Sequence, residues 1–587
     1  VRSPRSAGLG RACGRSRAGF IEGVGRRRPR TLTDTDARGK DHDFLYSRAE
    51  TRNAWNHGVS QSEVALDPWS GRVNMTTALR RALQQNPDRA LTIFGPRTRT
   101  VRESADRIAR LAGGLAALGV ARGDRVAILA LNSDRYHEYL LAVPWLGAVV
   151  NPCNIRWSAA ELGYALRESE TKVLLVDSAF AAMLPALREQ WDGLETVVYC
   201  GDGAAPDGCV EYEQLIADAS PILDVDCGPD DLYGVFFTGG TTGFAKGVML
   251  SHRNMIASAM GSLATLDFVV RGGRLLHTAP MFHLADIATW NAGMMAGSTH
   301  VIVPSFTPSS VVGAIAEHHV TDVLLVPTMI QFLVDSPAIE SADLSSLRGV
   351  VYGASPISAA LLQRARKAFP AARFVQAYGM TELSPVATLL SPEDHDDPQL
   401  TGSCGRGAIH VEVRIVDSSG KEVPRGTVGE VLVRGENVMI GYWGRPGDSA
   451  EALRGGWMHT GDGGYMNDAG YVFIVDRMKD MIISGGENVY SVEVENALAR
   501  HVAVAACAVI GIPDNQWGER VHAVVVLHPG AQLSVDELQE SCRSHIAGYK
   551  VPRTVEFVDA LPLSGAGKVL KRELRERHRS GTGSQIS

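Results

Sequence analysis

The sequence lacks three features that would assign it to well-defined classes of protein. Its 587 residues include only eight cysteines, and no two form a C-x-x-C pair: Cys13, Cys153, Cys200, Cys209, Cys227, Cys404, Cys507 and Cys542. Neither a zinc site nor a disulfide framework is therefore indicated, and a reducing, cytoplasmic compartment fits. The chain has a net charge of -7 and so lacks the positive field expected of a protein that binds nucleic acid or an anionic membrane. No run reaches the roughly 18 apolar residues of a spanning helix.

What remains is an ordinary globular composition, with 45% hydrophobic and 21% charged residues. A chain of this length is too long for one hydrophobic core, so we expect two or more domains. Acidic small molecules stay possible ligands through local cations. The sequence leaves open a peripheral contact with a membrane and a homodimer.

Residues 1–74 differ from the rest because they are rich in Arg, Gly and Ser and have little periodic apolar pattern. Such a segment cannot bury enough apolar surface to order itself. It fits a mitochondrial-type transit peptide, a nucleic-acid-binding arm, or an over-extended start site. We favour the last, because the helical pattern of the globular part begins at Met75, and we expect residues 1–74 to be disordered or mis-assigned.

Hydrophobic patterning divides the remaining chain into three stretches. From about residue 90 to 400, short apolar runs alternate with helical patterns, which predicts parallel sheet. From about residue 401, short runs separated by Gly, Pro and Asp predict antiparallel sheet or a small barrel. After Arg477 a second, smaller α/β stretch follows, and the last residues have the composition of a frayed end.

A segment rich in glycine and threonine, Phe237–Gly247, contains the first motif. It reads FTGGTTGFAKG between two apolar runs, and its N–H groups and hydroxyls suit a loop around a phosphate chain. The spacing differs from the common phosphate loop, in which four residues separate Gly from Gly-Lys-Ser/Thr. Taken alone, the segment fits a flexible surface loop equally well.

Three further segments contain the residue types that a nucleotide site needs. Gln376–Glu382 combines an aromatic ring, a hydroxyl and a carboxylate, which suit a base, a phosphate and Mg²⁺. Trp457–Asp462 supplies a carboxylate that can accept hydrogen bonds from two ribose hydroxyls. Pro562–Val569 places a lysine in a glycine-rich loop, where its charge can neutralise a transferring phosphate. Each segment alone also fits a polar turn, a helix cap or a solvated lysine.

In this order and spacing, the four motifs resemble the adenylate-forming superfamily of acyl-CoA synthetases, luciferases and peptide-synthetase adenylation domains, over about Met75 to Arg577. The resemblance implies an α/β fold with a large N-terminal domain of two mainly parallel sheets, helices and a small β-barrel. A small, mobile α+β C-terminal domain would follow. It places the domains at residues 75–478 and 479–577, before a frayed tail at 578–587.

The resemblance also implies an ATP-dependent acid–thiol ligase. The substrate carboxylate attacks the α-phosphorus of ATP, pyrophosphate leaves, and the thiol of coenzyme A then takes the acyl group and releases AMP. ATP, Mg²⁺ and coenzyme A are the implied cofactors and substrates. No protein nucleophile is needed, so catalysis rests on positioning and charge stabilisation. A catalytically inactive nucleotide-binding scaffold is disfavoured because Glu382, Asp462 and Lys568 are all present.

Carried over position by position, the resemblance gives each motif residue a role. The ATP-binding residues are Thr238, Gly239, Gly240, Thr241, Thr242, Gly243 and Lys246 for the phosphates, Gly353, Ala354, Ser355, Pro356, Tyr378 and Gly379 for adenine, Thr381 for the α-phosphate, and Asp462 and Arg477 for the ribose. The catalytic residues are Lys568, the adenylation lysine, Glu382, the Mg²⁺ ligand, and Thr238, a weaker Mg²⁺ ligand. Lys479 falls at the hinge, and Gly485 and Gly486 line the coenzyme A tunnel.

The segment Pro280–Ile287 occupies the family position that borders the acyl pocket. Its His283 stands where peptide-synthetase domains have an aspartate for the α-amino group, which argues against that branch. The expected pocket residues are His283, Ile287, Trp290 and Met380, with Met294, Met295 and Thr328 nearby. Flexible methionines suit an alkyl chain, so we expect a medium- or long-chain fatty acid. An aryl or cinnamate-type acid, or loading of a carrier protein, is the alternative.

Overall fold

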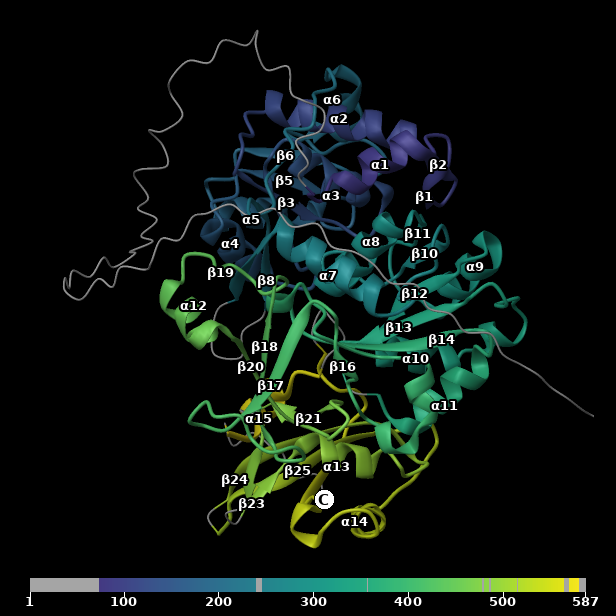
Figure 1. The fold of residues 1–587 in the computed structure, drawn as a ribbon, viewed down its shortest axis with the longest axis vertical. Helices are drawn as coiled ribbons and strands as arrows, with labels where there is room; N and C mark the ends of the chain where they lie inside the picture. Colours follow the sequence, from purple (N-terminus) through teal and green to yellow (C-terminus); the bar gives the residue numbers. More distant parts are fainter. Residues whose placement is uncertain are drawn as a thin grey trace, which may run out of the picture. The chain divides into compact units, whose positions relative to one another are not determined.

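The computed structural model describes residues 73–238, 245–355, 357–477, 480–484, 487–514, 516–563 and 569–579. The chain folds into two large, mainly parallel sheets and two smaller sheets (Figure 1). The first helix, α1 (Thr77–Gln85), begins where the sequence predicts the globular part to begin. The boundary predicted at residues 478–479 lies outside the described residues, so the division into domains stays a proposal.

The first large sheet has nine strands. In sheet order they are β16 (Arg406–Gly407), β15 (Thr388–Leu390), β14 (Arg373–Tyr378), β13 (Gly349–Gly353), β12 (Asp322–Leu325), β10 (Arg274–His277), β11 (Thr299–Ile302), β1 (Ala90–Phe94) and β2 (Arg97–Thr100). The strands from β14 to β1 run parallel, and the edge strands pair antiparallel. Because parallel strands need crossover connections, helices lie between them in the sequence.

The second large sheet has eight strands. In sheet order they are β19 (Gly441–Tyr442), β9 (Lys246–Ser251), β8 (Leu232–Thr238), β4 (Val149–Pro152), β3 (Arg125–Leu129), β5 (Val173–Val176), β6 (Thr196–Tyr199) and β7 (Val210–Glu211). Successive residues of β3 pack into different cores: Val126 and Ile128 into one, Ala127 and Leu129 into the other. A strand that buries both faces reads as a continuous apolar run, as this one does.

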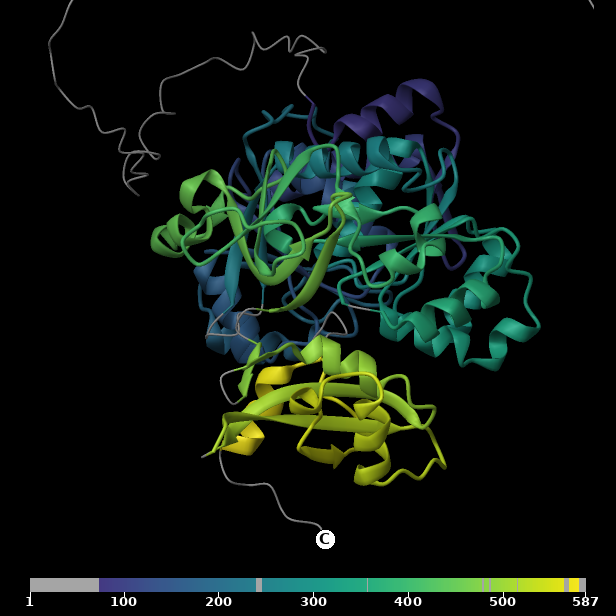
Figure 2. The same cartoon turned by 60° about the horizontal axis from the view of Figure 1, so that its bottom comes forward.

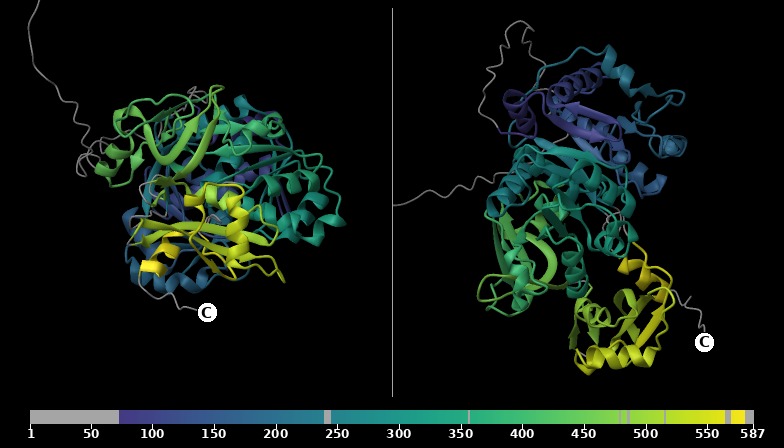
Figure 3. Two further views of the ribbon diagram at one scale, coloured as in Figure 1. Left: turned by 90° about the horizontal axis from the view of Figure 1, so that it is seen from below. Right: turned by 90° about the vertical axis from the view of Figure 1, so that its right-hand side faces the viewer.

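Helices cover both faces of the two sheets (Figures 1 and 3). They are α2 (Val101–Ala117), α3 (Asp134–Trp145), α4 (Ala159–Glu168), α5 (Leu184–Gln190), α6 (Tyr212–Asp218), α7 (His252–Thr265), α8 (Leu284–Ala296), α9 (Pro308–His318), α10 (Pro327–Val334), α11 (Ala359–Ala368) and α12 (Pro446–Ala452). Helix α8 is shared: Trp290 packs into the core of the eight-stranded sheet, and Ala292 packs with Leu275 of the nine-stranded sheet. It is therefore buried on almost every side.

The strands expected to form a small barrel make a four-stranded antiparallel sheet (green in Figure 2). Its order is β17 (Val411–Val416), β18 (Gly429–Gly435), β20 (Met458–Met466) and β21 (Val472–Arg477). The fourth sheet has the order β23 (Glu487–Val489), β22 (Ile482–Ser484), β25 (Gly518–Leu527) and β24 (Val504–Asp514), with β26 (Thr554–Phe557) paired to β25. Its helices are α13 (Ser491–Leu498), α14 (Val535–Arg543) and α15 (Lys571–Arg579). Within the described part of the chain, every helix is too short or too polar to cross a bilayer.

Candidate active site

Three of the predicted nucleotide residues lie together: Tyr378 and Arg477 end their strands, and Asp462 is in the middle of β20. Asp462 lies opposite Arg477 in the pairing of β20 with β21, and Tyr378 is the last residue of β14. The Tyr378 hydroxyl donates to Asp462 Oδ2 at 2.8 Å, and Arg477 Nε lies 3.2 Å from Oδ1. Burial and the Asp462 charge raise the pKa of Tyr378, so the phenol stays a donor at neutral pH.

The two members of this ion pair differ in exposure. Asp462 is 7% exposed, whereas the Arg477 side chain is 45% exposed. A carboxylate held from two sides has a fixed orientation and still has lone pairs to accept further hydrogen bonds. It therefore suits the predicted contact with a pair of ribose hydroxyls.

A second group links Glu382 to Lys246. The Tyr442 hydroxyl donates to Glu382 Oε1 at 2.8 Å, and Lys246 Nζ lies 5.0 Å from the centre of the Tyr442 ring. Asp448 Oδ2 is 3.1 Å from the same Nζ. The pairing of β19 with β9 brings Tyr442 beside this lysine. Glu382 and Lys246, which were predicted from separate motifs, therefore both contact Tyr442.

The hairpin of β8 and β9 positions the start and end of the predicted phosphate loop. Thr238 pairs with Lys246 in the antiparallel register, and its hydroxyl donates to the Lys246 carbonyl at 3.4 Å. The central loop residues, Gly239, Gly240, Thr241, Thr242 and Gly243, lie outside the described residues. The Thr238 hydroxyl and the Lys246 ammonium thus belong to neighbouring strands at one end of the hairpin.

Close backbone contacts explain two glycines of the predicted adenine segment. A Cβ on Gly353 would lie 2.1 Å from the Ala377 carbonyl oxygen, and one on Gly379 would lie 1.7 Å from that of Pro385. Ala354 follows with φ 67°, a conformation that is costly for a residue with a Cβ. Such local strain clusters at functional sites. Ser355 is partly buried next to it.

The described donors fit ATP and Mg²⁺. Glu382 is 7% exposed and lies in the short helical turn Thr381–Leu383, where it offers an oxygen ligand of the type that Mg²⁺ prefers. Thr381 begins this turn and is partly buried. Tyr442 contacts both the buried Glu382 carboxylate and the Lys246 ammonium. A carboxylate and a cation placed in this way suit a metal ion bound to phosphate.

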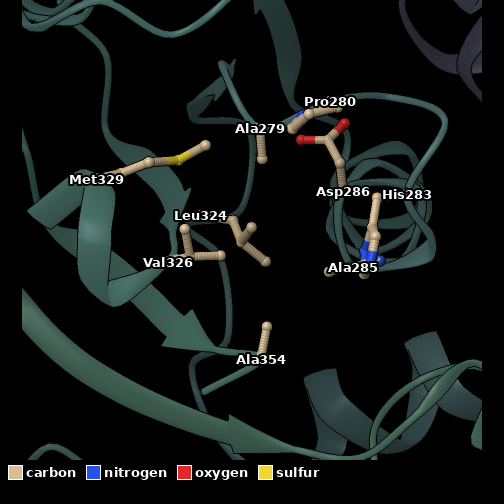
Figure 4. Close-up of a pocket in the computed structure, with 9 residues that line it drawn as sticks. All are labelled: Ala279, Pro280, His283, Ala285, Asp286, Leu324, Val326, Met329 and Ala354. Atoms are coloured by element: carbon tan, nitrogen blue, oxygen red, sulfur yellow. Dashed lines mark hydrogen bonds between the residues drawn. The ribbon is translucent and has the colours of Figure 1, made fainter. Parts of the chain in front are cut away.

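An apolar cavity lies between the loop before α8 and the ends of β12 and β13 (Figure 4). Its lining residues are Ala279, Pro280, His283, Ala285, Asp286, Leu324, Val326, Met329 and Ala354. Figure 4 shows Leu324 and Val326 on one side and His283 with Ala285 on the other. Asp286 and Ala354 lie toward opposite ends. Since Ala354 also belongs to the predicted adenine segment, the cavity adjoins the nucleotide region.

His283 begins α8 as its N-cap. Its side chain accepts the N–H of Ala285 at 3.2 Å through Nδ1, which satisfies one of the donors at the helix start. That bond fixes a lone pair on Nδ1, so the proton of the neutral ring is on Nε2. The histidine expected at the pocket mouth thus lines the cavity with its ring held by the helix.

Asp286 belongs to a buried chain of hydrogen bonds. Asp286 Oδ2 lies 2.8 Å from His277 Nδ1, and His277 Nε2 lies 2.9 Å from His300 Nδ1. All three residues are at most 1% exposed. Burial and the neighbouring His277 lower the pKa of His300 well below its usual value, so that ring is neutral. The carboxylate in the cavity wall is thus held in place from behind.

The other expected pocket residues are not in the cavity wall. Ile287 and Trp290 are fully buried in the core, and the Trp290 indole N–H donates to His137 Nδ1 at 2.9 Å. Met380 is partly buried and packs against the same core, which also contains Met294. Their predicted contact with an acyl chain stays a prediction.

Several predicted residues lie outside the described residues, and their roles stay predictions. They are the five loop residues named above, Pro356, the hinge residue Lys479, the tunnel residues Gly485 and Gly486, and the adenylation lysine Lys568.

Tyr442, Asp448 and the role of Asp286 were not predicted from the sequence. Tyr442 lies far from the glutamate and lysine that it contacts, in no motif that the analysis recognised. Asp286 did leave a signal, because it is a lone charge in the apolar helix LADIATWNAGMMA. A buried charge needs a partner, so its position could have pointed to a polar network.

Comparison with known proteins gives two matching families. The pattern of the AMP-binding enzyme family matches residues 79–443, and that of the AMP-binding enzyme C-terminal domain matches residues 493–568. The chain is 42% identical over 498 residues to a feruloyl-CoA synthase of Amycolatopsis sp, which covers 85% of this chain and 97% of that protein. It is 37% identical to the fatty acid–[acyl-carrier-protein] ligase ScoC of Streptomyces coeruleorubidus, over 84% of this chain and 94% of that one.

A solved structure extends the likeness to three dimensions. The crystal structure of ATP-bound MatB from Rhodopseudomonas palustris aligns with a TM-score of 0.79 and 31% identity, over 86% of this chain and 99% of that one. The fold, the two matching families and the hydrogen-bonded residues of the predicted nucleotide site therefore support the same family. This chain belongs to the AMP-binding enzyme family, in the acyl-CoA synthetase branch of the adenylate-forming, ATP- and Mg²⁺-dependent ligases.

Proposed function

We propose that this ligase activates a hydroxyaryl acid of the hydroxycinnamate type and transfers it to coenzyme A. The observation that supports this is the buried carboxylate of Asp286 in the wall of an otherwise mainly apolar cavity. A ring hydroxyl at that end could donate to the carboxylate, while the acid group points toward Ala354 and the nucleotide residues. A fatty acyl chain has no donor for this carboxylate and would add no hydrogen bond to the one that Asp286 Oδ2 already makes with His277 Nδ1.

The lining of the cavity is of a kind that can contact a ring, because Leu324 and Val326 can pack on a ring face and Ala279, Ala285 and Ala354 are small. The cavity has a volume of about 20 Å³, so a ring would enter only with movement of the side chains around it. The preference for an alkyl chain depended on flexible methionines, and one of them, Met294, lies in the core. The 42% identity to a feruloyl-CoA synthase supports the same class of acid.

In this proposal the nucleotide residues position ATP for in-line attack by the acid. Asp462 and Arg477 hold the ribose, Thr381 the α-phosphate, and Thr238 and Lys246 the phosphates that leave as pyrophosphate. Glu382 would hold Mg²⁺, which supplies charge neutralisation at the phosphates when bound. The carboxylate oxygen forms a bond to the α-phosphorus as the bond to pyrophosphate breaks, and the thiol of coenzyme A then displaces AMP.

The test is pyrophosphate release across a panel of acids, with and without coenzyme A. The panel pairs cinnamate with 4-hydroxycinnamate and ferulate, and adds octanoate and palmitate. We expect the two hydroxylated acids to give the highest kcat/KM, and acyl-CoA to form only when coenzyme A is present. Pyrophosphate release that is independent of every acid would contradict a ligase.

A second candidate substrate, a medium- or long-chain fatty acid, is favoured by Met329 in the cavity wall and by the likeness to a fatty acid ligase. Met is flexible and adapts to an alkyl chain. A higher kcat/KM for octanoate or palmitate than for ferulate would select this candidate. Adding a carrier protein in place of coenzyme A decides the acceptor.

We further propose two domains, residues 75–478 and 479–577, that divide the two half-reactions. Lys568 would act in adenylation, and Gly485 with Gly486 would line the coenzyme A tunnel, with Lys479 as the hinge. A Lys568→Ala variant should then lose adenylation but still form thioester from a supplied acyl-adenylate. Equal loss of both half-reactions would contradict the division.

A further inference from the structure

Two histidines and a glutamate lie together in the C-terminal α+β part of the chain, and none of the three belongs to a motif described above. They are His522 of β25, Glu556 of β26 and His578 of α15. Their ligand atoms all lie within 4.8 Å of one another. The family patterns and the proposed reaction leave this group without a role.

The alternation of the sheet explains why these side chains meet. In β25, Val521, Ala523 and Val525 pack into the core with α13 and α14, whereas Val524 packs with Leu574 of α15. His522, which is in phase with Val524, therefore faces α15. Residues spaced four apart share a helix face, so His578 lies on the same side of α15 as Leu574.

Strand register adds the third ligand. The pairing of β25 with β26 sets His522 beside Thr554 and Val524 beside Glu556, so Glu556 projects from the face that α15 covers. Glu556 Oε2 lies 3.3 Å from His578 Nε2 and 3.8 Å from His522 Nε2. Ligand atoms bound tetrahedrally at about 2.0–2.1 Å from an ion are separated by about 3.3 Å. The distance from Glu556 to His578 equals this spacing, and the distance from Glu556 to His522 is longer and would have to shorten when an ion binds.

The buried ring of His522 points a nitrogen into this group. His522 is 4% exposed, and its Nε2 has no hydrogen-bond partner among the described residues. Its Nδ1 lies 2.7 Å from the Thr554 hydroxyl oxygen. A ring that donates from Nδ1 to this oxygen keeps the Nε2 lone pair free, which is how ligating histidines are commonly oriented.

We propose that His522, Glu556 and His578 bind a divalent transition-metal ion of the Zn²⁺ type, with water at the fourth position. Imidazole and carboxylate ligands suit Zn²⁺, whereas Mg²⁺ demands an octahedral set of oxygens. The ion joins α15 to the sheet at β25 and β26. It also gives the buried Nε2 of His522 a partner, which the described residues do not provide.

The electrostatic surroundings are compatible with a bound cation. Arg520 is the nearby cation that opposes binding, and Asp514 Oδ2 lies 3.8 Å from its Nε. Glu556 supplies the negative charge at the site itself.

The experiment is calorimetric titration of the chelator-treated, full-length chain with ZnCl₂, in excess Mg²⁺ and without ATP. We expect one high-affinity Zn²⁺ per chain, and a rise in the melting temperature on addition of Zn²⁺ but not of further Mg²⁺. His578→Gln and Glu556→Gln alter partly exposed positions, so they should fold, and each should lose the high-affinity binding and the thermal shift.

His545→Gln is the matched control, because His545 is exposed and outside the group. It should bind Zn²⁺ as the unchanged chain does. Thr554→Val should weaken binding by about 10- to 100-fold, the usual effect of removing a partner behind a ligand. Absence of stoichiometric binding in the unchanged chain, or equal binding in His578→Gln, would overturn the proposal.

Discussion

The proposed nucleotide region, which contains Tyr378, Glu382 and Asp462, and the proposed acid region, which is the cavity lined by Asp286, hold their polar groups in different ways. In the nucleotide region, each carboxylate is held by a tyrosine at its edge: Asp462 by Tyr378 and Glu382 by Tyr442. The cations beside them, Arg477 and Lys246, are partly exposed. In the acid region, by contrast, Asp286 is held from behind by histidines that are wholly buried.

This difference indicates what each region can discriminate. The partly exposed ion pairs of the nucleotide region leave lone pairs and charge available to ATP. ATP is the same whichever acid is activated. In the proposed function, the single carboxylate in a mainly apolar wall would discriminate among acids, because a site built to bond a hydroxyl strongly rejects an analogue that lacks it. Substitutions in the nucleotide region should therefore affect all acids equally, and substitutions in the acid region should change the order of acids.

The largest effect is expected for Glu382→Gln. The change removes the charge that would hold Mg²⁺ but keeps the shape, so adenylation should fall by about 10²–10³-fold, as for loss of one well-placed charge-stabilising group. Pyrophosphate release measured with ferulate, cinnamate and octanoate should fall by the same factor. Glu189→Gln, at an exposed position on α5, should have no effect. A loss of activity with only one of the acids would contradict the expectation that the nucleotide region serves all acids equally.

Asp462→Asn should have the next largest effect. Hydrogen bonds to a charged group contribute about 1.5–3 kcal/mol, so the KM for ATP should rise roughly 10- to 100-fold while the ratio of kcat/KM values between acids stays fixed. Tyr378→Phe keeps the ring and removes only the hydroxyl bond to this carboxylate, so it should give a smaller rise. Steady-state kinetics at varied ATP measure both. An unchanged KM for ATP would contradict the ribose role.

The two regions also differ in how far the sequence predicted them. Tyr378, Glu382 and Asp462 are in short, dense motifs, and the structure joins Tyr378 to Asp462 directly. The parallel and antiparallel sheets were predictable too, because the patterns of apolar residues that indicate strands and helices extend over only a few neighbouring residues. Tyr442 was not, since its contact with Lys246 depends on the pairing of β19 with β9.

The acid region was harder to predict because α8 has almost no exposed face. Ile287 and Trp290 are apolar and close to the predicted pocket in sequence, yet both are fully buried in the core. Periodicity distinguishes a buried face from an exposed one, but it cannot tell which buried face adjoins a cavity. The nearby Asp286 lines the cavity instead, and the contacts that hold it come from β10 and β11.

Asp286→Asn should have a smaller but more selective effect. If its carboxylate accepts the ring hydroxyl, the preference for 4-hydroxycinnamate over cinnamate should fall about tenfold, equivalent to about 1.4 kcal/mol. The KM for ATP should change little. Competition assays with both acids in one reaction measure the ratio directly, which corrects for any general loss of folded enzyme. A preserved preference would remove Asp286 from substrate recognition and favour the fatty acid.

The smallest effect is expected from the buried histidines behind the acid region, and it concerns stability. Burial lowers the pKa of His137 to about 3, below its usual value near 6.5. Below pH 6.5 the unfolded chain therefore binds a proton that the folded chain does not, so the free energy of unfolding falls as the pH falls. Between pH 6.5 and 5.5 this residue should account for a loss of about 1 kcal/mol.

The variant His137→Gln keeps an acceptor for the Trp290 indole N–H and removes the titrating ring. Denaturant unfolding at pH 7.5, 6.5 and 5.5 should show a shallower pH dependence than in the unchanged chain, whereas the exposed His545→Gln should keep the original slope. The ratio of activities on different acids at pH 7.5 should be unaffected, because His137 lies outside the cavity wall. An altered ratio would mean that the buried network, and not Asp286 alone, determines which acid binds.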